Sequence, residues 1–564
     1  MIKATVFVGS TDIEVARRRR RRVGRPVRGA VLAALVLALP GMAAASPEGE
    51  RLLDDVAAAM GGRDAILGVR TLQADGYGME AYFWGGGNIT ADRDAPQKWA
   101  ENPNFSAIWD FANDRYRTQY RHNFLFPFGG TFGHSFAVSA WGIDGEVGYT
   151  IGPTGTAARL AEWTPHGGAW FKPDGAVFRR YESLSHPLAA VRAVLAGRAV
   201  PENVRIEDGA PVVDLVIDEG YVTLGIEPQT MLPRWVRWTA PHQNLGEVVI
   251  TTTFVGYQDF DGVQLPFTWV ARIDWRNTLI QTRLLDGYYL NSSKTPDIAA
   301  PAAVRAQPLP PAAPQAAPIT ATKIADGLWH LNPGGHTVIE FADHLAIFEM
   351  GGSTAQARAA IAFANGLVPG KPLTHLIVSH HHFDHTLGFR AAVEAGLTVI
   401  SHWGNEEILR DMATRPAPNF ADLVPNPNGA LLKFVPVRGR LRLEDETMTL
   451  DVYEVVKHNH MANAVFAYAP KSRTFIEADL ATPANQFSFW AEAYEDNLEH
   501  YGLEVDMVSP NHVARPMTHE ETLAWIAEGV PRALARCEEL LTIGRPIPGC
   551  PPYIYRDWDG RVRR

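Results

Sequence analysis

The chain has 564 residues, of which 46% are hydrophobic and 20% charged, a composition typical of globular domains and unlike that of disordered, collagen-like or coiled-coil chains. This length exceeds what one hydrophobic core usually serves, so we expect two or more domains. A formal net charge of −10 excludes a generally basic nucleic-acid-binding protein, and two cysteines are too few for a disulfide scaffold or a four-cysteine metal site.

The first 45 residues have the pattern of a secretory signal peptide. Six consecutive arginines, Arg17–Arg22, precede an apolar stretch at residues 30–40 and the small residues Ala43-Ala44-Ala45-Ser46. The apolar stretch is shorter than the roughly 20 residues that a membrane-spanning helix needs. We therefore predict a periplasmic or secreted protein, with the export route left open and a net charge of −17 after removal of residues 1–45. A basic arm for nucleic acid or an anionic membrane is the alternative interpretation.

Residues 46–295 are predicted to form a β-rich domain. Apolar residues at helical spacing predict a helix over Pro47 to Met60 that ends at Gly61-Gly62. From Thr71 to about Leu290, short alternating segments between Gly, Pro and Asp turns predict an antiparallel sheet curved around an apolar groove. The clearest segments are residues 212–217, 221–226, 247–254 and 272–284.

The helix, the long meander and the run Gly262-Val263-Gln264-Leu265-Pro266 together resemble the half-barrel folds of bacterial lipoprotein carriers. This resemblance implies that the domain binds an apolar ligand, contacts a lipid or membrane surface transiently, or shapes an active-site entrance. An all-β domain of another kind is the alternative.

A proline- and alanine-rich segment, residues 296–319, is predicted to be a linker, because its seven prolines favour an extended chain that buries little. After Ile319, strand-like and helix-like segments alternate. Residues 355–367 and 389–395 are expected as helices, and residues 373–380, 397–402, 449–456, 465–468, 474–476 and 505–508 as strands. Residues 320–564 are thus expected to form a two-sheet sandwich covered by helices and followed by a C-terminal tail. The whole chain is then expected to be of the α+β class. In that tail, Cys537 and Cys550 either pair in an oxidising compartment or stay unpaired.

One short run carries the strongest chemical signal. The run His380-His381-His382-Phe383-Asp384-His385 begins at the end of the strand predicted at residues 373–380. Imidazole and carboxylate groups are the ligands that suit zinc and neighbouring divalent ions. A single histidine in a sheet protein is more often a packing or surface group, but the pattern His-x-His-x-Asp-His after a buried strand indicates a metal site.

This pattern resembles the metallo-β-lactamase-fold superfamily over residues 320–530, which implies an αββα sandwich and a two-metal site. By the resemblance, His380 and His382 bind one metal and Asp384 and His385 bind the second. The third histidine of the first metal is expected at His460, with His458 as the alternative. The remaining implied ligands are Asp479, which would bridge both ions, and His512.

The sequence departs from the superfamily pattern at three positions. Glu349 stands where an Asp usually supports the site from behind the ligands, and Ala478 and Asn511 replace the glycines usual beside the bridging Asp and the last His. These changes add bulk near the metals but remove no ligand.

The ligands imply hydrolysis. Two zinc ions, with iron or manganese as the other candidates, would lower the pKa of a shared water and supply a bridging hydroxide. Asp384 is the predicted catalytic residue, because it would orient the hydroxide and pass a proton toward the leaving group. β-Lactamases of the superfamily generally have Cys or Ser where this chain has Asp479, which is instead similar to type II glyoxalases, lactonases and phosphodiesterases. The predicted substrate is a small, partly apolar ester, lactone or related acyl compound, and nothing in the sequence indicates an oligomeric state.

Two other functions stay open at this point. One is a mononuclear-iron, persulfide-dioxygenase-like oxidoreductase, because such enzymes retain many of these ligands. The other is a lipid or lipoprotein carrier with a vestigial metal domain. Aromatic residues near the motifs are candidate substrate walls, with packing in the core as the alternative for each: Phe383, Trp403, Phe487, Phe489 and Trp490.

Overall fold

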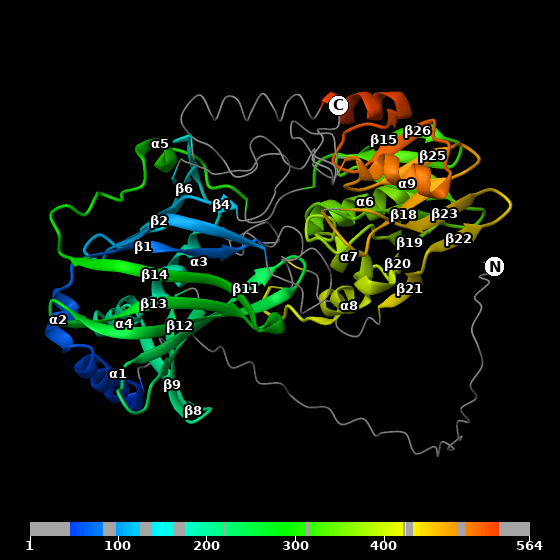
Figure 1. Ribbon diagram of the computed structural model, residues 1–564. Coiled ribbons are helices and arrows are strands. Elements are labelled where there is room, and N and C mark those ends of the chain that lie inside the picture. Colours follow the sequence, from blue (N-terminus) through cyan, green and yellow to red (C-terminus); the bar gives the residue numbers. More distant parts are fainter. Residues whose placement is uncertain are drawn as a thin grey trace, which may run out of the picture.

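The computed structural model describes residues 46–82, 98–124, 138–152, 154–162, 175–218, 220–311, 316–420, 424, 432–458, 460–481 and 491–528. These residues form a large N-terminal sheet and a C-terminal region of two further sheets (Figure 1). The predicted signal peptide and both cysteines lie outside the described residues. Among the helices that are described, none combines the length and the apolar character that crossing a membrane requires.

The N-terminal region is one antiparallel sheet in which most neighbouring strands of the chain pair in sequence, while β4 pairs with β2 and β3 pairs with β5. Strands β8 to β14 form one meander, and β1 joins β14 to the second meander that runs to β7. Its strands are β1 (Thr71–Ala81), β2 (Trp99–Asp110), β3 (Arg115–Tyr120), β4 (Asn123–Phe124), β5 (Ser139–Asp144), β6 (Val147–Ile151), β7 (Ala157–Arg159), β8 (Val200–Glu207), β9 (Ala210–Ile217), β10 (Gly220–Ile226), β11 (Pro233–His242), β12 (Gly246–Phe260), β13 (Val263–Ile273) and β14 (Thr278–Leu290). The predicted antiparallel architecture is confirmed.

The helices that pack against this sheet in the described part of the chain are α1 (Pro47–Ala59), α2 (Arg63–Gly68), α3 (Ala176–Leu184) and α4 (Pro187–Leu195). The predicted first helix is present, and it starts where Ser46 accepts a hydrogen bond from the backbone N–H of Gly49 at 2.9 Å. It ends before Gly61, whose φ of +115° suits glycine.

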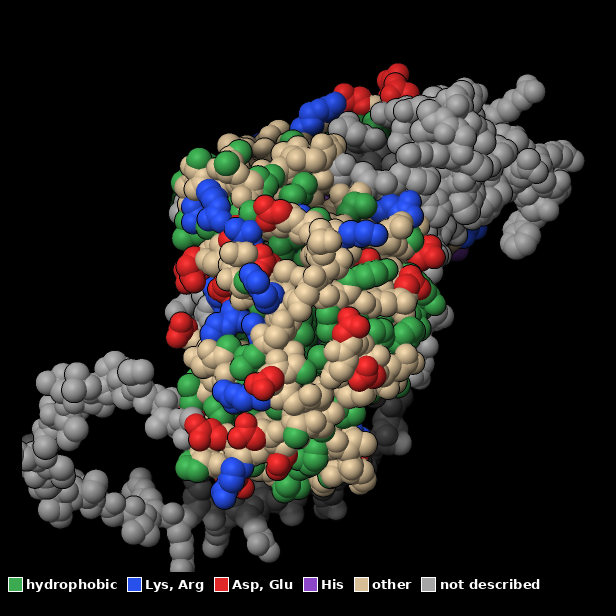
Figure 2. Space-filling view, turned by 90° about the vertical axis from the view of Figure 1, so that its left-hand side faces the viewer, with side chains coloured by type: hydrophobic (Ala, Val, Ile, Leu, Met, Phe, Trp, Pro, Cys, Tyr) green, Lys and Arg blue, Asp and Glu red, His purple; other side chains and the backbone are tan. Residues whose placement is uncertain are grey.

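On the face of the molecule shown in Figure 2, acidic and basic side chains are interspersed with hydrophobic ones.

A cavity of about 70 Å³ lies in the sheet domain, where the sequence predicted an apolar groove. Its walls are rich in aromatic side chains but also include charged ones, so it is not purely apolar. The principal lining residues are Phe105, Trp109, Phe178, Trp238, Trp269, Arg179, Glu182 and His186.

One predicted strand is interrupted. Residues 272–284 were expected to be a single extended segment, but the chain turns within them at η1 (Trp275–Asn277). Arg276 and Asn277 have φ values of +53° and +50°, so β13 ends and β14 begins there as a hairpin. Ile273 and Trp275 alternate with polar residues up to the turn, and Leu279 resumes the same spacing after it, so the segment resembled one strand although Asn277 and Thr278 interrupt the pattern.

The proline-rich segment packs more closely than a free linker would. Ile298, Ala300 and Val304 are buried beside Tyr149, and a short helix, α5 (Ala302–Arg305), lies within the segment. The hydroxyl of Tyr149 donates to the carbonyl of Ile298 at 2.7 Å, and the N–H of Ala300 donates to Asp144 at 2.8 Å. Buried apolar residues between the prolines hold the segment against the sheet.

The C-terminal region contains a mixed sheet of β15 to β21 and a second sheet of β22 to β27. The strands are β15 (Thr320–Ala325), β16 (Leu328–Asn332), β17 (His336–Glu340), β18 (Leu345–Phe348), β19 (Leu373–Ile377), β20 (Thr398–His402), β21 (Lys433–Val437), β22 (Arg440–Glu444), β23 (Thr449–Glu454), β24 (Val465–Ala469), β25 (Thr474–Glu477), β26 (Met507–Pro510) and β27 (Met517–Thr518). The helices are α6 (Thr354–Leu367), α7 (Phe389–Glu394), η2 (Trp403–Asn405), α8 (Glu406–Thr414) and α9 (Ala493–Tyr501).

The two sheets face each other across a hydrophobic core. Ala346 and Phe348 on β18 pack against residues of the second sheet such as Val452 and Ile476. Helix α9 covers the outer face of the second sheet through Tyr494. Helices α6 to α8 contribute to the other outer layer, so the predicted sandwich is confirmed.

The N-terminal sheet and the C-terminal sandwich share one continuous hydrophobic core. Asn244, in the turn between β11 and β12, is fully buried, and its side-chain amide donates to the carbonyl of Phe383 at 3.0 Å and to the hydroxyl of Thr386 at 2.9 Å. That hydroxyl donates in turn to the carbonyl of His382 at 2.8 Å. The N-terminal domain therefore holds the turn that carries the predicted metal motif.

We expect Asn244→Ala to lower the free energy of unfolding by about 1–3 kcal/mol, because it leaves buried partners without their hydrogen bonds. The midpoint of urea unfolding measures this loss. Asn419→Ala is the matched control, since Asn419 is exposed and bonds Glu247 across the same domain contact at 3.2 Å; its effect should stay within about 0.5 kcal/mol. Equal effects of the two substitutions would contradict the anchoring role of Asn244.

Candidate metal centre

The histidine motif lies immediately after β19, at the carboxyl end of a parallel strand. His380, His382 and His385 are almost completely buried. The turn packs tightly against the segment after β18, where a Cβ on Gly351 would lie 2.8 Å from the carbonyl oxygen of Asp384. Glycine at position 351 thus permits the close approach of the two loops.

The first cluster consists of His380, His382, His460 and Asp479, whose potential ligand atoms all lie within 4.8 Å of one another. The rings of His382 and His460 are 4.7 Å apart between centroids. These residues come from three separated stretches of the chain, and the sequence predicted that His380, His382 and His460 would hold one metal.

The second cluster consists of Asp384, His385 and His512, again with ligand atoms within 4.8 Å of one another. The Nε2 atoms of His385 and His512 are 3.2 Å apart. His512 is the exposed member of the cluster. Its φ of +59° turns the chain just after β26.

Asp479 lies between the two clusters. Its Oδ2 atom is 3.2 Å from Nε2 of His460 and 3.2 Å from Nε2 of His385, and its Oδ1 atom is 3.2 Å from Nε2 of His512. The carboxylate of Asp479, which the sequence predicted to bridge two ions, thus lies against histidine nitrogens of both clusters.

Three buried ligand atoms indicate that the centre suits a cation. Nε2 of His380, Nε2 of His382 and Oδ1 of Asp384 make no hydrogen bond within the described part of the chain. Buried polar atoms without partners are costly, and a bound cation would satisfy all three. Neutral imidazoles with carboxylates are also the donor set that zinc prefers, so the residues present fit a divalent metal.

Glu349 belongs to neither cluster but contacts residues of the histidine motif. One of its carboxylate oxygens accepts the N–H of Ser379 at 2.8 Å, and the other lies 2.8 Å from Nδ1 of His385. This contact fixes the ring so that Nε2 faces the cluster, as is common for histidine ligands. Ser379 acts similarly on His380, whose Nδ1 is 2.7 Å from the serine hydroxyl.

The two positions where glycine was expected have packing roles. Ala478 is completely buried in the core between the two sheets. The side chain of Asn511 donates to the carbonyl of Gly334 at 3.0 Å, and its backbone N–H donates to the carbonyl of Glu477 at 2.9 Å. Both residues therefore stabilise the loops that carry Asp479 and His512.

His458 belongs to neither cluster, whereas His460 belongs to the first. Its Nδ1 accepts the backbone N–H groups of His460 and Met461 at 3.1 and 3.2 Å, so its Nε2 carries the proton and donates to the carbonyl of Asp479 at 2.9 Å. Burial and the neighbouring His460 lower the pKa of His458 to about 3, which keeps it neutral. It shapes the loop and positions Asp479.

The two clusters differ in their affinity for protons. Burial, together with neighbouring histidines, lowers the pKa of His380 and of His382 well below the usual value. Burial also lowers the pKa of His385, but the carboxylates of Asp479, Asp384 and Glu349 outweigh it and hold this pKa well above the usual value. The pKa of His512 is raised as well, where Asp479 outweighs burial.

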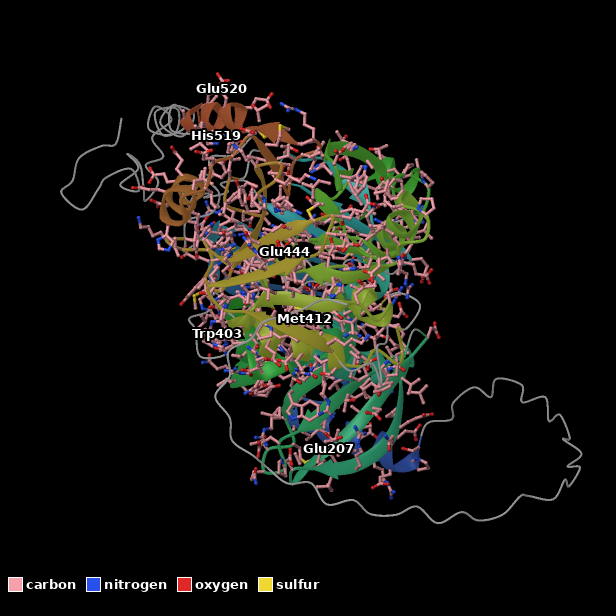
Figure 3. All side chains as sticks on the ribbon, turned by 90° about the vertical axis from the view of Figure 1, so that its right-hand side faces the viewer. Glu207, Trp403, Met412, Glu444, His519 and Glu520 are labelled. Atoms are coloured by element: carbon pink, nitrogen blue, oxygen red, sulfur yellow. The ribbon has the colours of Figure 1, made fainter. Side chains whose placement is uncertain are left out.

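The structure places two of the five aromatic residues that the sequence offered as substrate walls or core residues. Phe383 is fully buried in the domain contact, with its ring 5.2 Å from that of His242 and 6.1 Å from that of Trp275, so it is a core residue. Trp403 lies at the surface (Figure 3) and is 46% exposed. The guanidinium of Arg438 lies over its ring, 4.6 Å from the ring centroid. Phe487, Phe489 and Trp490 lie outside the described residues.

Lys98 and Tyr82 of the N-terminal domain lie near the centre, which the sequence did not indicate. Both interact electrostatically with Asp384 and Asp479. Burial lowers the pKa of Lys98 to about 8, against the opposing effect of the two carboxylates, so the ammonium is still mainly protonated at neutral pH. Both residues are distant from the motif in the chain, and no local pattern could have identified them.

Residues 337–486 match the family model of the metallo-beta-lactamase superfamily, which confirms the resemblance predicted from the sequence. Members of this superfamily are generally metal-dependent hydrolases. Among curated proteins, none matches the chain.

Solved structures match the chain in part. A metallo-beta-lactamase from Pontibacter korlensis is 14% identical, with 38% of this chain and 99% of that chain covered and a TM-score of 0.29. One from Hirschia baltica is 17% identical, with 38% and 98% covered and a TM-score of 0.29. A sec-alkylsulfatase from Pseudomonas sp. is 18% identical, with 40% and 43% covered and a TM-score of 0.28.

We expect the second cluster to lose its metal at a higher pH than the first. The raised pKa values of His385 and His512 mean that protons compete with a cation there as the pH falls, whereas His380 and His382 stay neutral. Zinc per chain, measured after dialysis between about pH 8 and 5, should fall in two steps. His512→Gln should remove the step at higher pH and leave the other. Simultaneous loss of all zinc would contradict the difference between the clusters.

Proposed function

We propose that the chain is an exported, dinuclear zinc hydrolase that cleaves an ester, lactone or related acyl bond. The observation that carries this proposal is the position of the Asp479 carboxylate, which lies 3.2 Å from histidine nitrogens of both clusters. The superfamily match of residues 337–486 supports metal-dependent hydrolysis in general. Zinc is proposed because the donors are imidazoles and carboxylates with no described thiolate among them.

His380, His382 and His460 would hold one ion, Asp384, His385 and His512 the other, and Asp479 both. When bound, two divalent cations supply a water of lowered pKa and polarise the oxygen of the scissile bond. Glu349 and Ser379 keep the rings of His385 and His380 in the orientation that presents Nε2. Burial of the cluster strengthens each of these electrostatic interactions.

Asp384 is the proposed proton carrier. Its Oδ1 atom is buried and makes no hydrogen bond to the described residues, so it is available to the attacking water. Burial raises the pKa of Asp384; His385 opposes this shift and the nearby Asp479 adds to it. The Asp384 carboxylate can accept the proton of the water and later release it to the leaving group.

We expect Asp384→Ala to reduce kcat/KM by about 100- to 10,000-fold, because proton transfer and one ligand are lost together. Assays should cover nitrophenyl esters, lactones, phosphodiesters and a chromogenic cephalosporin, with the zinc content of each sample measured. Asp326→Ala is the matched control, since Asp326 is exposed and pairs with Lys323 at 2.8 Å on the surface. Full activity of Asp384→Ala would refute the mechanism, and iron at one per chain with oxygen consumption would favour the oxidoreductase.

The proposal that the protein is exported rests on the arginine run, the apolar stretch and the small residues that end at Ala45. In a Gram-negative host expressing the full chain, we expect the protein in the periplasmic or extracellular fraction with a mature N-terminus near Ser46. N-terminal sequencing and fractionation measure both. Replacement of the apolar residues Leu35, Val36 and Leu37 by serines should retain the unprocessed chain in the cell. An uncleaved N-terminus on exported wild-type protein would contradict the predicted signal peptide.

A further inference from the structure

We propose that the aromatic cavity of the N-terminal domain is a binding site for an uncharged amide group of about the size of acetamide. All residues that line this cavity lie between Glu80 and Gln281, and none of them belongs to either metal cluster. The site is therefore separate from the metal centre and does not depend on the proposed hydrolase function.

The cavity lies between helix α3 and the strands of the N-terminal sheet. Its wall includes side chains of β1 to β3 and of β11 to β14, together with His186 just before α4. Flat rings form much of this wall: Phe105, Trp109, Tyr116, Phe178, Trp238 and Trp269. A wall of aromatic faces with a few polar groups favours a flat ligand whose orientation those polar groups fix.

The volume of about 70 Å³ limits the size of the group that the cavity encloses. For comparison, an apolar cavity of about 150 Å³ holds benzene with its ring of carbon atoms. By proportion, this cavity suits roughly three or four non-hydrogen atoms. The enclosed group is therefore much smaller than a lipid chain or an aromatic ring.

One buried hydrogen-bond donor in the wall has no acceptor. Nε1 of Trp238 makes no hydrogen bond within the described part of the chain, and this residue is only 5% exposed. The other two tryptophans of the wall differ from it. Trp109 donates its indole N–H to the carbonyl of Ser183 at 3.2 Å, and Trp269 donates to the hydroxyl of Tyr288 at 3.2 Å. Because a buried donor without an acceptor costs free energy, Trp238 favours a ligand that carries an acceptor oxygen.

One buried acceptor in the wall, on His186, has no donor. The hydroxyl of Tyr288 donates its hydrogen to the carbonyl of Pro266 at 2.8 Å. Nε2 of His186 lies 3.1 Å from the same hydroxyl oxygen, so Nε2 must be the donor in that contact. Nδ1 then has a free lone pair in the neutral ring, and it makes no hydrogen bond to the described residues. Burial lowers the pKa of His186 to about 3, which keeps the ring neutral.

The donor and the acceptor lie in different groups of rings. The ring of His186 contacts the rings of Trp109 and Trp269, with centroids 4.8 and 5.1 Å apart. The ring of Trp238 instead stacks on that of Tyr181 at 5.5 Å. A hydroxyl would have to serve both places through one oxygen, whereas an amide presents a carbonyl oxygen and an N–H on two different atoms. The amide oxygen then accepts from Trp238, and the amide N–H donates to Nδ1 of His186.

The charged residues of the wall do not require a charged ligand, because they are paired. Arg179 donates to Glu182, and the carboxylate of Glu80 lies 3.9 Å from the guanidinium of Arg283. A carboxylate ligand would bring an additional charge among aromatic side chains and would offer no hydrogen to Nδ1 of His186. Burial of such a charge without a partner is costly, so the ligand is neutral.

The test compares acetamide with acetone and acetate, which are flat probes of the same size that differ in one substituent. Isotope labelling of the tryptophan nitrogens in the full, zinc-loaded chain gives an NMR signal for each indole N–H, and the signal lost in Trp238→Phe identifies Trp238. We expect acetamide to shift this signal to saturation at roughly millimolar concentrations. Its Kd should be about tenfold lower than that of acetone, which lacks the N–H, and acetate should not bind. Equal affinities for acetamide and acetone, or no saturable shift with acetamide, would overturn the proposal.

Two variants test the wall groups separately. His186→Gln keeps a donor within reach of Tyr288 but places a methylene at the position of Nδ1, so acetamide should lose most of its advantage over acetone. Trp238→Phe should weaken acetamide binding about tenfold, measured by saturation transfer to the ligand. Trp109→Phe is the matched control, because it removes an indole from the same wall whose N–H the protein already bonds. Equal losses in the two tryptophan variants would contradict the role of Trp238. The wild-type comparison of acetamide with acetone needs no variant, so misfolding of a variant does not weaken the test.

Two further measurements define the ligand and separate the cavity from the metal centre. N-Butylacetamide carries the same amide on a longer chain. Binding as tight as that of acetamide would assign the site to amide groups of larger molecules, and weaker binding would assign it to free small amides. Acetamide should shift the Trp238 signal equally in zinc-loaded and zinc-free protein, whether or not any ester is hydrolysed. Loss of this shift on removal of zinc would place the amide at the metals and overturn the proposal.

Discussion

The organisation of the metal centre depends on the carboxylate of Asp479, because this one group contacts histidines from both clusters. Its backbone has a φ of +61°, a left-handed conformation that Asp tolerates better than most residues. Glu477 stabilises the turn by accepting the N–H groups of Leu480 and Ala481 at 2.8 and 3.3 Å. The bend at the end of β25 thereby directs the carboxylate between the clusters, and the rest of the site is arranged around it.

The N-terminal domain participates in this arrangement through three kinds of contact. Asn244 holds the motif turn by hydrogen bonds, Phe383 fills the space between the domains, and Lys98 places a charge near the carboxylates. The shared hydrophobic core makes it costly for the domains to separate. Phe383, which the sequence suggested as a substrate wall, thus connects the metal motif to the second domain.

Residues around the ligands compensate for the departures from the superfamily pattern. Glu349, in a left-handed conformation with a φ of +70°, still reaches His385 and also accepts the N–H of Ser379. Ala478 fills the core between the sheets, and Asn511 bonds the loop at Gly334. Each of the three replacements thus makes a packing or hydrogen-bond contact next to a candidate ligand.

Sequence patterns predict the antiparallel N-terminal sheet, the two-sheet C-terminal fold and the residues that gather at the centre, because alternation of apolar residues and the spacing of ligands are local signals. They missed the turn at Arg276, because the apolar spacing resumes after the polar Asn277 and Thr278, and they left His458 and His460 as alternatives, because two residues of separation cannot show which ring faces inward. Only the tertiary structure brought Lys98, Tyr82 and Asn244 to the motif, since contacts between distant segments depend on how the two domains pack, which no periodicity records.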